Sequence, residues 1–183
     1  MSEIYEPSED SYLMSDTLKK ELPKLLKINP RLKLLEVGCG SGINLETAKK
    51  LGVNVNNILG ADINKEAVKH CKSLGFNCIK SDLFDNIKGK FDVIIFNPPY
   101  LLLDKREPKF SRITTTGGLQ GNEVTIRFLK QANKHLTKDG RIFIITSSLS
   151  KSINFNKLGY NSKEVSSVKL FFEKLSVWEC LKI

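Results

Sequence analysis

The chain has 183 residues, of which 40% are hydrophobic, and this is enough for one domain of ordinary size with a substantial core. Lys and Arg number 29 against 20 Asp and Glu, a formal net charge of +9, but the lysines are spread along the chain, which favours a solvated surface over a dedicated nucleic-acid patch. The acidic start and the lack of an apolar run of membrane-spanning length argue against a signal peptide and a membrane protein, and they predict a cytoplasmic location.

Strands and helices are predicted to alternate through most of the chain. An amphipathic helix comes first, at residues 10–27, where leucines recur at helical spacing with lysines between them. Apolar runs and helical patterns follow in turn. They predict a strand at 34–37, a helix at 43–51, a strand at 58–62, a helix at 65–74, strands at 77–80 and 91–96, a helix at 124–135 and a strand at 141–146. This alternation implies a parallel sheet with helices on both faces.

The end of the chain departs from this alternation. The stretches 165–171 and 175–181 are separated only by Phe172-Glu173-Lys174, which is too short for a helical crossover. They therefore predict an antiparallel hairpin at one edge of the sheet. The expected fold class is α/β, with a seven-stranded, mostly parallel sheet that ends in an antiparallel hairpin.

A glycine-rich turn follows the first strand, with the sequence Glu36-Val37-Gly38-Cys39-Gly40-Ser41-Gly42. Glycines let the backbone approach a ligand closely, and ligands of open α/β sheets bind at the carboxyl ends of the strands. A dinucleotide enzyme would favour the spacing GxGxxG, whereas Asn44 and Leu45 follow Gly42 here. Taken alone, the motif leaves a tight turn without a ligand as an alternative.

Acidic residues end the next two strands. Asp62 can accept both hydroxyl hydrogens of a ribose, although an acid at this position is often only a helix cap, and Asn64 could equally cap the following helix. Asp82 suits an adenine amino group, with Leu83 against the ring. Together with the glycine turn, and without a P-loop lysine motif, these residues predict an adenosine site that has no phosphate site. This combination favours S-adenosylmethionine over nucleotides.

The tetrapeptide Asn97-Pro98-Pro99-Tyr100 directly follows the buried strand that ends at Phe96. An amide or exocyclic amine is a poor nucleophile because its lone pair is delocalised into the π system. The Asn97 side-chain oxygen and the Pro98 carbonyl can each accept one N–H, which orients the nitrogen toward a methyl group. The prolines hold these acceptors in an extended geometry, and Tyr100 can stack on the flat target. The tetrapeptide predicts N-methyl transfer that needs no general base before attack.

With these motifs the sequence resembles the class I S-adenosylmethionine-dependent methyltransferases that carry the NPPY signature. Within them it is similar to the HemK-type enzymes, which methylate the glutamine of the GGQ tripeptide in translation release factors. Residues 5–11 with Leu13 resemble the YEPxEDT segment of the archaeal and eukaryotic branch, and residues 117–121 resemble the family's GGxxG loop. The resemblance implies one Rossmann-like domain over 1–183. Its residues 1–30 would form a segment and helix that cover the cofactor, and 31–183 the catalytic core.

The resemblance also implies residue roles and partners. The catalytic residues would be Asn97, Pro98, Pro99 and Tyr100, and no residue is assigned to a metal. S-adenosylmethionine, with S-adenosylhomocysteine as product, would contact Ser11, Glu36, Gly38, Gly40, Asp62, Asp82, Leu83 and Asn97. Bacterial members have an N-terminal helical domain that this sequence lacks, which indicates the short branch. That branch implies a release factor as substrate and a small zinc-binding activator subunit.

We expect the activator at residues 76–80, because strand 77–80 lies at an edge of the sheet in this topology and can be extended by a strand of another chain. Its apolar neighbours Phe76, Cys78 and Ile79 exceed the needs of a solvated edge, whereas Lys80 is consistent with simple protection of that edge. The long loop 101–121 is expected to be a mobile lid that binds the target, although residues 101–103 could simply cover the core.

Other functions stay open at this stage. N-methylation of an exocyclic amine of adenine or guanine in RNA or DNA uses the same hydrogen-bonding logic, but such enzymes usually need an added recognition domain or a pocket for a flipped base. Methylation of lysine in other proteins and a catalytically silent scaffold are further alternatives. The cysteines form no CxxC pair and have no metal-like spacing with the histidines, so reduced thiols are expected. These residues are Cys39, Cys71, Cys78, Cys180, His70 and His135.

Overall fold

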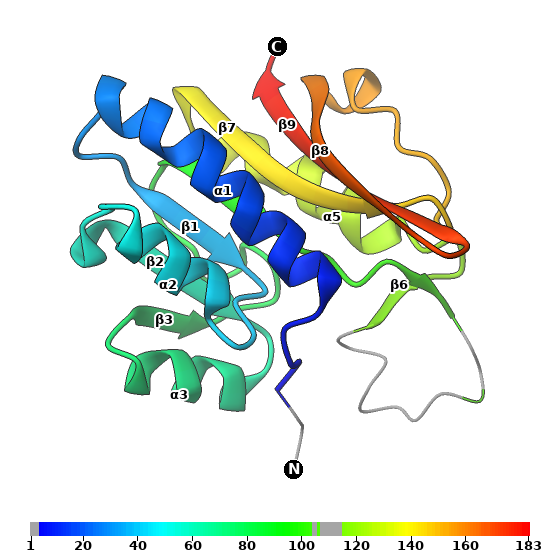
Figure 1. Ribbon diagram of the computed structural model, residues 1–183, viewed down its shortest axis with the longest axis horizontal. Coiled ribbons are helices and arrows are strands. Elements are labelled where there is room, and N and C mark those ends of the chain that lie inside the picture. Colours follow the sequence, from blue (N-terminus) through cyan, green and yellow to red (C-terminus); the bar gives the residue numbers. More distant parts are fainter. Residues whose placement is uncertain (1–3, 104–105, 107–114) are drawn as a thin grey trace.

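The computed structural model describes residues 4–103, 106 and 115–183. A seven-stranded sheet forms its centre, in the order β3-β2-β1-β4-β7-β9-β8 (Figure 1). The strands β1, β2, β3, β4 and β7 run parallel to one another, and β9 is antiparallel to both β7 and β8. The bounds are β1 (Leu34–Val37), β2 (Ile58–Asp62), β3 (Asn77–Lys80), β4 (Phe91–Phe96), β7 (Leu136–Ser147), β8 (Tyr160–Leu170) and β9 (Glu173–Lys182). The predicted sheet and its terminal hairpin are confirmed.

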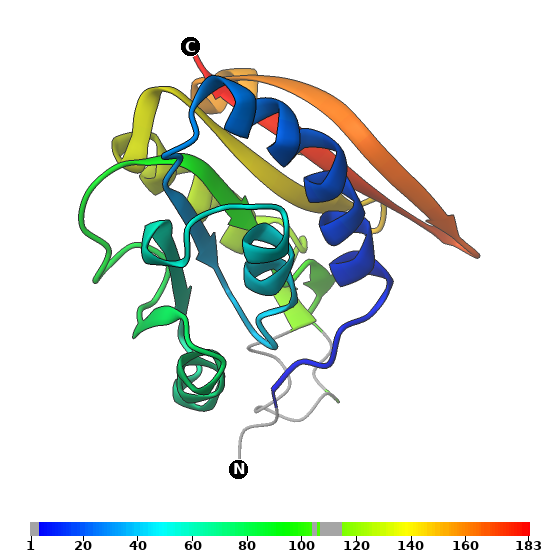
Figure 2. The same cartoon turned by 60° about the vertical axis from the view of Figure 1, so that its left-hand side comes forward.

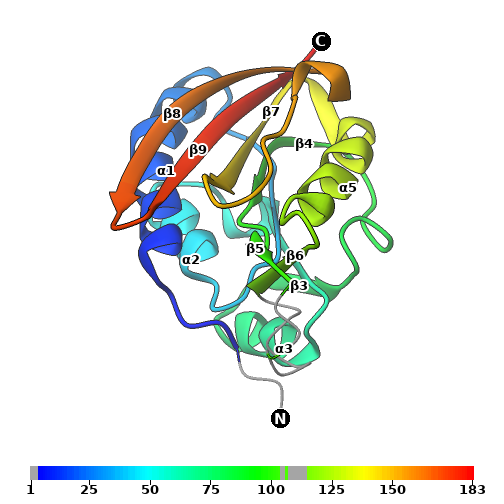
Figure 3. The same ribbon diagram turned by 90° about the vertical axis from the view of Figure 1, so that its right-hand side faces the viewer.

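Helices cover both faces of the sheet, as Figure 3 shows in a view along the layers. One face carries α1, α2 and α3, whose buried side chains share a core with Leu34, Val93 and Ile145. The other face carries α5, whose Phe128 and Leu129 share a second core with Leu35 and Ile94. The bounds are α1 (Glu9–Ile28), α2 (Ile43–Lys50), α3 (Lys65–Ser73), α5 (Glu123–Ala132) and the 3₁₀ turns η1 (Val55–Asn57), η2 (Asn133–His135) and η3 (Asn156–Leu158). Neighbouring residues of one strand thus alternate between two cores, which explains the continuous apolar runs.

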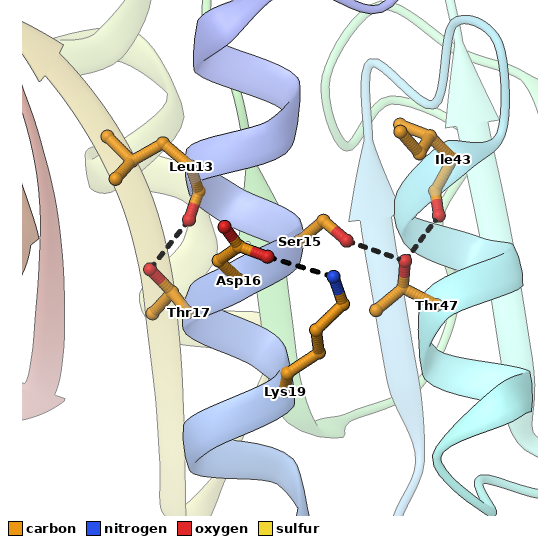
Figure 4. Close-up of polar contacts among 7 residues, drawn as sticks. All are labelled: Leu13, Ser15, Asp16, Thr17, Lys19, Ile43 and Thr47. Carbon is orange, nitrogen blue, oxygen red and sulfur yellow. Dashed lines mark hydrogen bonds and ion pairs between the residues drawn. The ribbon is translucent and has the colours of Figure 1, made fainter. Parts of the chain in front are cut away.

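The position of α1 matters for the site, because its first turn lies at the carboxyl ends of the strands (Figure 2). Leu18 and Leu22 are fully buried, which anchors the helix on the sheet. A second anchor is polar: the Ser15 hydroxyl lies 2.9 Å from that of Thr47 on α2, as Figure 4 shows. The hydroxyl of Thr47 also donates to the Ile43 carbonyl at 2.8 Å. These contacts fix the beginning of α1 relative to the glycine-rich turn before α2.

Three features differ from the sequence expectation. Strand β7 begins at Leu136, several residues before the predicted start, because its first part pairs with Phe91 across a register shift. The hairpin turns at Phe171 and Phe172, and both of its strands are longer than predicted. Within the expected loop, β5 (Leu101–Leu102) pairs with β6 (Thr116–Gly118) in a small parallel ladder. About half of the expected lid, at 104–105 and 107–114, lies outside the described residues.

Strand β3 lies at one edge of the sheet and β8 at the other, as expected. The apolar character of β3 has a different cause from the one inferred from sequence. Phe76 is 4% exposed and Cys78 2%, and both belong to the core under α3. Only Ile79 remains half-buried, so the edge has little apolar surface, and the Lys80 carbonyl at its end accepts from the Asn86 side chain at 3.0 Å. No helix among residues 4–103, 106 and 115–183 is long and apolar enough to cross a membrane.

Candidate active site

A cavity of about 470 Å³ opens at the carboxyl ends of the central strands. Every residue that the sequence assigned to catalysis or to the cofactor lines it. They are Ser11, Glu36, Gly38, Gly40, Asp62, Asp82, Leu83, Asn97, Pro98, Pro99 and Tyr100. Parallel strands bring their carboxyl ends to one edge, and this is why residues from β1, β2, β3 and β4 meet here. The roles of these residues stay proposals, but their convergence is a property of the fold.

The glycine-rich turn has a backbone that needs glycine. Gly38, Gly40 and Gly42 have φ angles of +68°, +47° and +80°, in the left-handed region that other residues rarely adopt. The amide of Gly38 donates to the Ala61 carbonyl at 2.7 Å, which ties the turn to β2. A Cβ atom on Gly40 would meet no atom within 4 Å, so this glycine borders open space. The turn therefore leaves room for a ligand directly above the end of β1.

Asp62 braces this turn from β2. Its carboxylate accepts the amide of Gly40 at 2.9 Å and the amide of Asn64 at 2.8 Å. The α3 cap is supplied by Asn64, whose side chain accepts from the Glu66 amide at 3.0 Å. Burial raises the pKa of Asp62. Capping of α3 therefore does not explain Asp62, which lines the cavity where a ribose is expected.

Glu36 carries a buried acceptor without a partner. Its side chain is 2% exposed, and one oxygen accepts from the Asn44 amide at 2.8 Å. The other oxygen, Oε2, has no hydrogen-bond partner in the described part of the chain. Burial raises the pKa of Glu36 to about 8, and the Asn44 hydrogen bond opposes that rise. An unpaired buried carboxyl oxygen on a cavity wall is costly, and a cationic ligand group would satisfy it.

The third acidic residue, Asp82, has a partner that the sequence did not indicate. One of its oxygens accepts from Arg127 of α5 at 2.5 Å, with side chains 39% and 51% exposed, respectively. Next to it, Leu83 has a φ angle of +46°, which is uncommon for a residue with a side chain and points to a position held by its surroundings. Leu83 is buried and lines the cavity. The arrangement leaves one Asp82 oxygen for a ligand beside an apolar wall.

The orientation of Asn97 is set by a carboxylate that the sequence did not single out. Asp10, 5% exposed at the start of α1, accepts from the Asn97 amide nitrogen at 2.9 Å. Because the nitrogen faces Asp10, the Asn97 oxygen Oδ1 points away from it, and this oxygen is buried without a partner among the described residues. Tyr5 and Tyr100 also donate to Asp10, at 3.1 and 3.3 Å. The result is an oriented, unpaired acceptor at the end of β4, as methyl transfer to an N–H group would need.

The side chain and the backbone of Tyr100 are both held by contacts with other parts of the chain. Burial raises its pKa, and the nearby Asp10 carboxylate adds to this effect. The GGxxG loop packs against the same backbone: a Cβ atom on Gly117 would lie 2.6 Å from the Pro99 carbonyl, and one on Gly121 would lie 2.6 Å from the Tyr100 carbonyl. Ser150 donates to that Tyr100 carbonyl at 2.6 Å. The two glycines thus let the loop buttress the tetrapeptide. Stacking of Tyr100 on a target stays a prediction.

Comparison with known proteins agrees with this geometry. The family model described as methyltransferase small domain matches residues 11–168. A putative protein N5-glutamine methyltransferase of Methanocaldococcus jannaschii is 37% identical over 96% of this chain and 90% of its own length. The chain belongs to the methyltransferase small domain family. It is an enzyme of the HemK-like type that the sequence motifs predicted.

Two further similarities concern release factors. The catalytic subunit mtq2 of the eRF1 methyltransferase from Schizosaccharomyces pombe is 28% identical to this methyltransferase over 99% of the chain and 90% of its own length. The E. cuniculi Mtq2-Trm112 complex, responsible for the methylation of the eRF1 translation termination factor, contains a chain of the same fold. The TM-score is 0.73 at 24% identity, and the alignment covers 100% of both chains.

Three charged residues that line the cavity were missed by sequence reasoning: Asp10, Arg127 and Glu173. Asp10 stands inside the segment YEPSED that resembles the family motif, so that segment carried a signal for it. Arg127 is one cation on an amphipathic helix, and Glu173 lies at the beginning of a strand in the terminal hairpin. Nothing local in the sequence distinguishes these two from surface charges.

Proposed function

We propose that this methyltransferase transfers a methyl group from S-adenosylmethionine to the side-chain nitrogen of a glutamine in a translation release factor. The observation that carries the proposal is the oxygen of Asn97, a residue that lines the cavity: the oxygen is buried, oriented by Asp10 and unpaired among the described residues. The relatives named for protein N5-glutamine and eRF1 methylation support the same substrate class. Translation factors are cytoplasmic, which agrees with the location expected from sequence.

The residues present fit S-adenosylmethionine. The unpaired Oε2 of Glu36 suits the ammonium group, Asp62 the ribose hydroxyls and Asp82 with Leu83 the adenine. When bound, the cofactor supplies an electrophilic methyl group. The Asn97 oxygen and the Pro98 carbonyl would accept the two N–H groups of the glutamine, which would orient its nitrogen for transfer. The nitrogen is neutral before attack and loses its proton to water afterwards, so Asp10 acts only by positioning Asn97.

A protein substrate is also supported by the surface around the cavity. Phe171 and Phe172 form the tip of the β8–β9 hairpin and are 96% and 95% exposed, more than any other large apolar side chain in the described chain. Glu173, next in sequence, lines the cavity. Figure 1 shows that this tip lies at the same end of the sheet as the start of α1 and β6. Two exposed aromatic rings beside an active site are typical of a protein-binding surface.

We expect that the double substitution Phe171→Ser and Phe172→Ser weakens use of the release factor. Loss of about 2 kcal/mol of apolar contact would lower kcat/KM about thirtyfold through KM, with cofactor affinity unchanged. Steady-state kinetics against a release factor would measure this, and Ile28→Ser, which removes an 81% exposed side chain at the other end of α1, serves as control. Unchanged KM in the double variant would show that the tip does not contact the substrate.

Cofactor binding is expected to depend on the ionisation of Glu36. Burial raises the pKa of this group to about 8, so at pH 7 it is mostly protonated in the free enzyme. The cofactor ammonium favours the carboxylate, so binding should release a proton, and affinity should rise with pH from about 6 to 8 by up to about tenfold per unit. Calorimetry at pH 7 in buffers of different ionisation heat counts this proton. Glu36→Gln should bind more weakly and lose this release, and equal release by both proteins would exclude the role.

The Mtq2-Trm112 complex of E. cuniculi suggests that this enzyme also has a partner subunit. We propose that a small activator subunit, as expected from the resemblance, extends the sheet at β3. The support is the position of β3 at the edge of the sheet and the two-subunit assembly named for the E. cuniculi relative. Ile79→Asp should prevent complex formation in size-exclusion chromatography while the enzyme stays folded. Ser162→Asp, on the exposed opposite edge strand β8, should leave the complex intact. A complex that survives Ile79→Asp would place the partner elsewhere.

One experiment separates the substrate classes. The enzyme, with and without the activator, is incubated with methyl-labelled cofactor and with either a release factor or bulk RNA. We expect label in the release factor and little in RNA. Label in RNA alone would favour methylation of an exocyclic base amine, for which the net charge of +9 is the supporting feature.

A further inference from the structure

Three cysteine side chains that are far apart in the sequence meet beneath the glycine-rich turn. Cys39 belongs to the turn, Cys71 to α3 and Cys78 to β3, and their sulfur atoms all lie within 4.8 Å of one another. They are 3%, 0% and 2% exposed. Spacing in the sequence gave no sign of this cluster, because the fold brings the residues together through the parallel pairing of β1, β2 and β3.

The space around the cluster is shaped by glycines. A Cβ atom on Gly60 of β2 would lie 2.6 Å from the Cys78 sulfur and 3.3 Å from the Cys39 sulfur. A Cβ atom on Gly42 would lie 3.1 Å from the Cys71 sulfur. The sulfur atoms therefore lie against Gly42 and Gly60, where any side chain would displace them. The Cys71 thiol donates to the Gly40 carbonyl at 3.5 Å, so a backbone oxygen also lies beside the cluster.

The separations suit one metal ion better than a disulfide. Zn–S bonds are about 2.3 Å long, so three sulfurs around one zinc ion lie about 4 Å apart, and the cluster needs little movement to reach that geometry. A disulfide would require one pair to close to about 2.05 Å and would leave the third thiol unused. Thiolate sulfur is a soft ligand that selects zinc or copper(I).

Charge favours the divalent ion. Three thiolates with Zn²⁺ carry a net charge of −1, whereas copper(I) would leave −2. Two carboxyl groups lie near the cluster: Asp62 accepts from the amide of Gly40, the residue after Cys39, and Glu36 is three positions before Cys39. Additional negative charge is therefore unfavourable there. We propose that Cys39, Cys71 and Cys78 form a zinc-binding site in this enzyme. The ion would join the cofactor turn, α3 and the edge strand β3 in one rigid unit.

The test uses the full chain. Native mass spectrometry after dialysis against Zn²⁺ should show one ion per chain, and Co²⁺ should give the intense near-ultraviolet absorption of thiolate-to-cobalt charge transfer. Cys71→Ser and Cys78→Ser should each weaken Zn²⁺ binding at least about a hundredfold, because even partners outside the ligand shell are worth 10–100-fold. Cys180→Ser, which removes a buried thiol in the other core, should bind as the wild type does.

Two results would overturn the proposal. One is a folded wild-type chain that binds no Zn²⁺ and gives no thiolate band with Co²⁺, and this readout does not depend on any variant being folded. The other is equal loss of binding in Cys180→Ser, which would indicate unspecific thiol binding. A Cu⁺ complex that outcompetes Zn²⁺ in the same titration would contradict the choice of metal. None of these results depends on the substrate of the enzyme.

Discussion

Asn97→Ala is expected to lower kcat about a hundredfold, which corresponds to a loss of roughly 3 kcal/mol of transition-state stabilisation. The reason is the geometry of its amide: the nitrogen is bound to Asp10, and the buried oxygen is left free for the substrate. Alanine removes the acceptor but does not touch the walls that Glu36 and Asp62 provide for the cofactor. Cofactor affinity should therefore change little, as isothermal calorimetry can show.

The control for Asn97→Ala is Asn57→Ala, which removes a half-buried amide of η1 that donates to the Arg31 carbonyl and does not line the cavity, and this variant should be as active as the wild type. Single-turnover kinetics would assign the loss to the transfer step and not to product release. Full activity of Asn97→Ala would remove the acceptor role. A large loss of cofactor affinity with an unchanged rate of transfer would show that Asn97 binds the cofactor and not the substrate.

Asp10→Ala should have the second largest effect, although we expect Asp10 itself not to contact the glutamine. A hydrogen bond to a charged group contributes about 1.5–3 kcal/mol, so loss of the Asn97 contact would lower kcat about 10- to 100-fold. Without Asp10 the Asn97 amide can rotate and turn its nitrogen toward the substrate. Tyr5 and Tyr100 lose the same acceptor, which loosens the wall around the tetrapeptide.

Conservative substitution distinguishes positioning from a purely structural role of Asp10. Asp10→Asn keeps an oxygen that can accept from Asn97, so it should recover part of the lost kcat. Asp16→Ala, on the exposed face of the same helix, removes only an ion pair with Lys19 and should be neutral. If Asp10→Ala and Asp10→Asn both lower the melting temperature but leave kcat unchanged, the role of Asp10 is only structural.

Much of the fold follows from patterns that are local in the sequence. The buried run Phe91–Phe96 could be assigned to a central strand because both of its faces are covered, by α1 on one side and α5 on the other. Apart from Ser11 on α1, the site residues could be predicted because they lie at the end of a strand or just after it, and the carboxyl ends of parallel strands meet at one edge. Glycine at positive φ and asparagine before two prolines are chemically distinctive, so these residues were recognisable before any contact was known.

Contacts between distant side chains could not be read from the sequence. Asp10 and Asn97 are separated by 87 positions and Asp82 and Arg127 by 45, and nothing in either local pattern specifies the partner. The cysteine cluster has the same origin. The edge strand gave a misleading signal, because Phe76 and Cys78 are apolar for packing under α3 and not for a partner. Tertiary packing decides which side chains meet. The periodicity of the sequence predicts only which residues are buried.

The central claim is that the NPPY site methylates a glutamine side chain in a release factor. Tandem mass spectrometry of the release factor after incubation with the enzyme, the proposed activator and unlabelled S-adenosylmethionine tests this most directly. The account predicts one additional methyl group on the glutamine side chain of the GGQ tripeptide, absent when Asn97→Ala replaces the wild type. Methylation of a lysine, or an unmodified release factor beside a methylated nucleic acid, would contradict it.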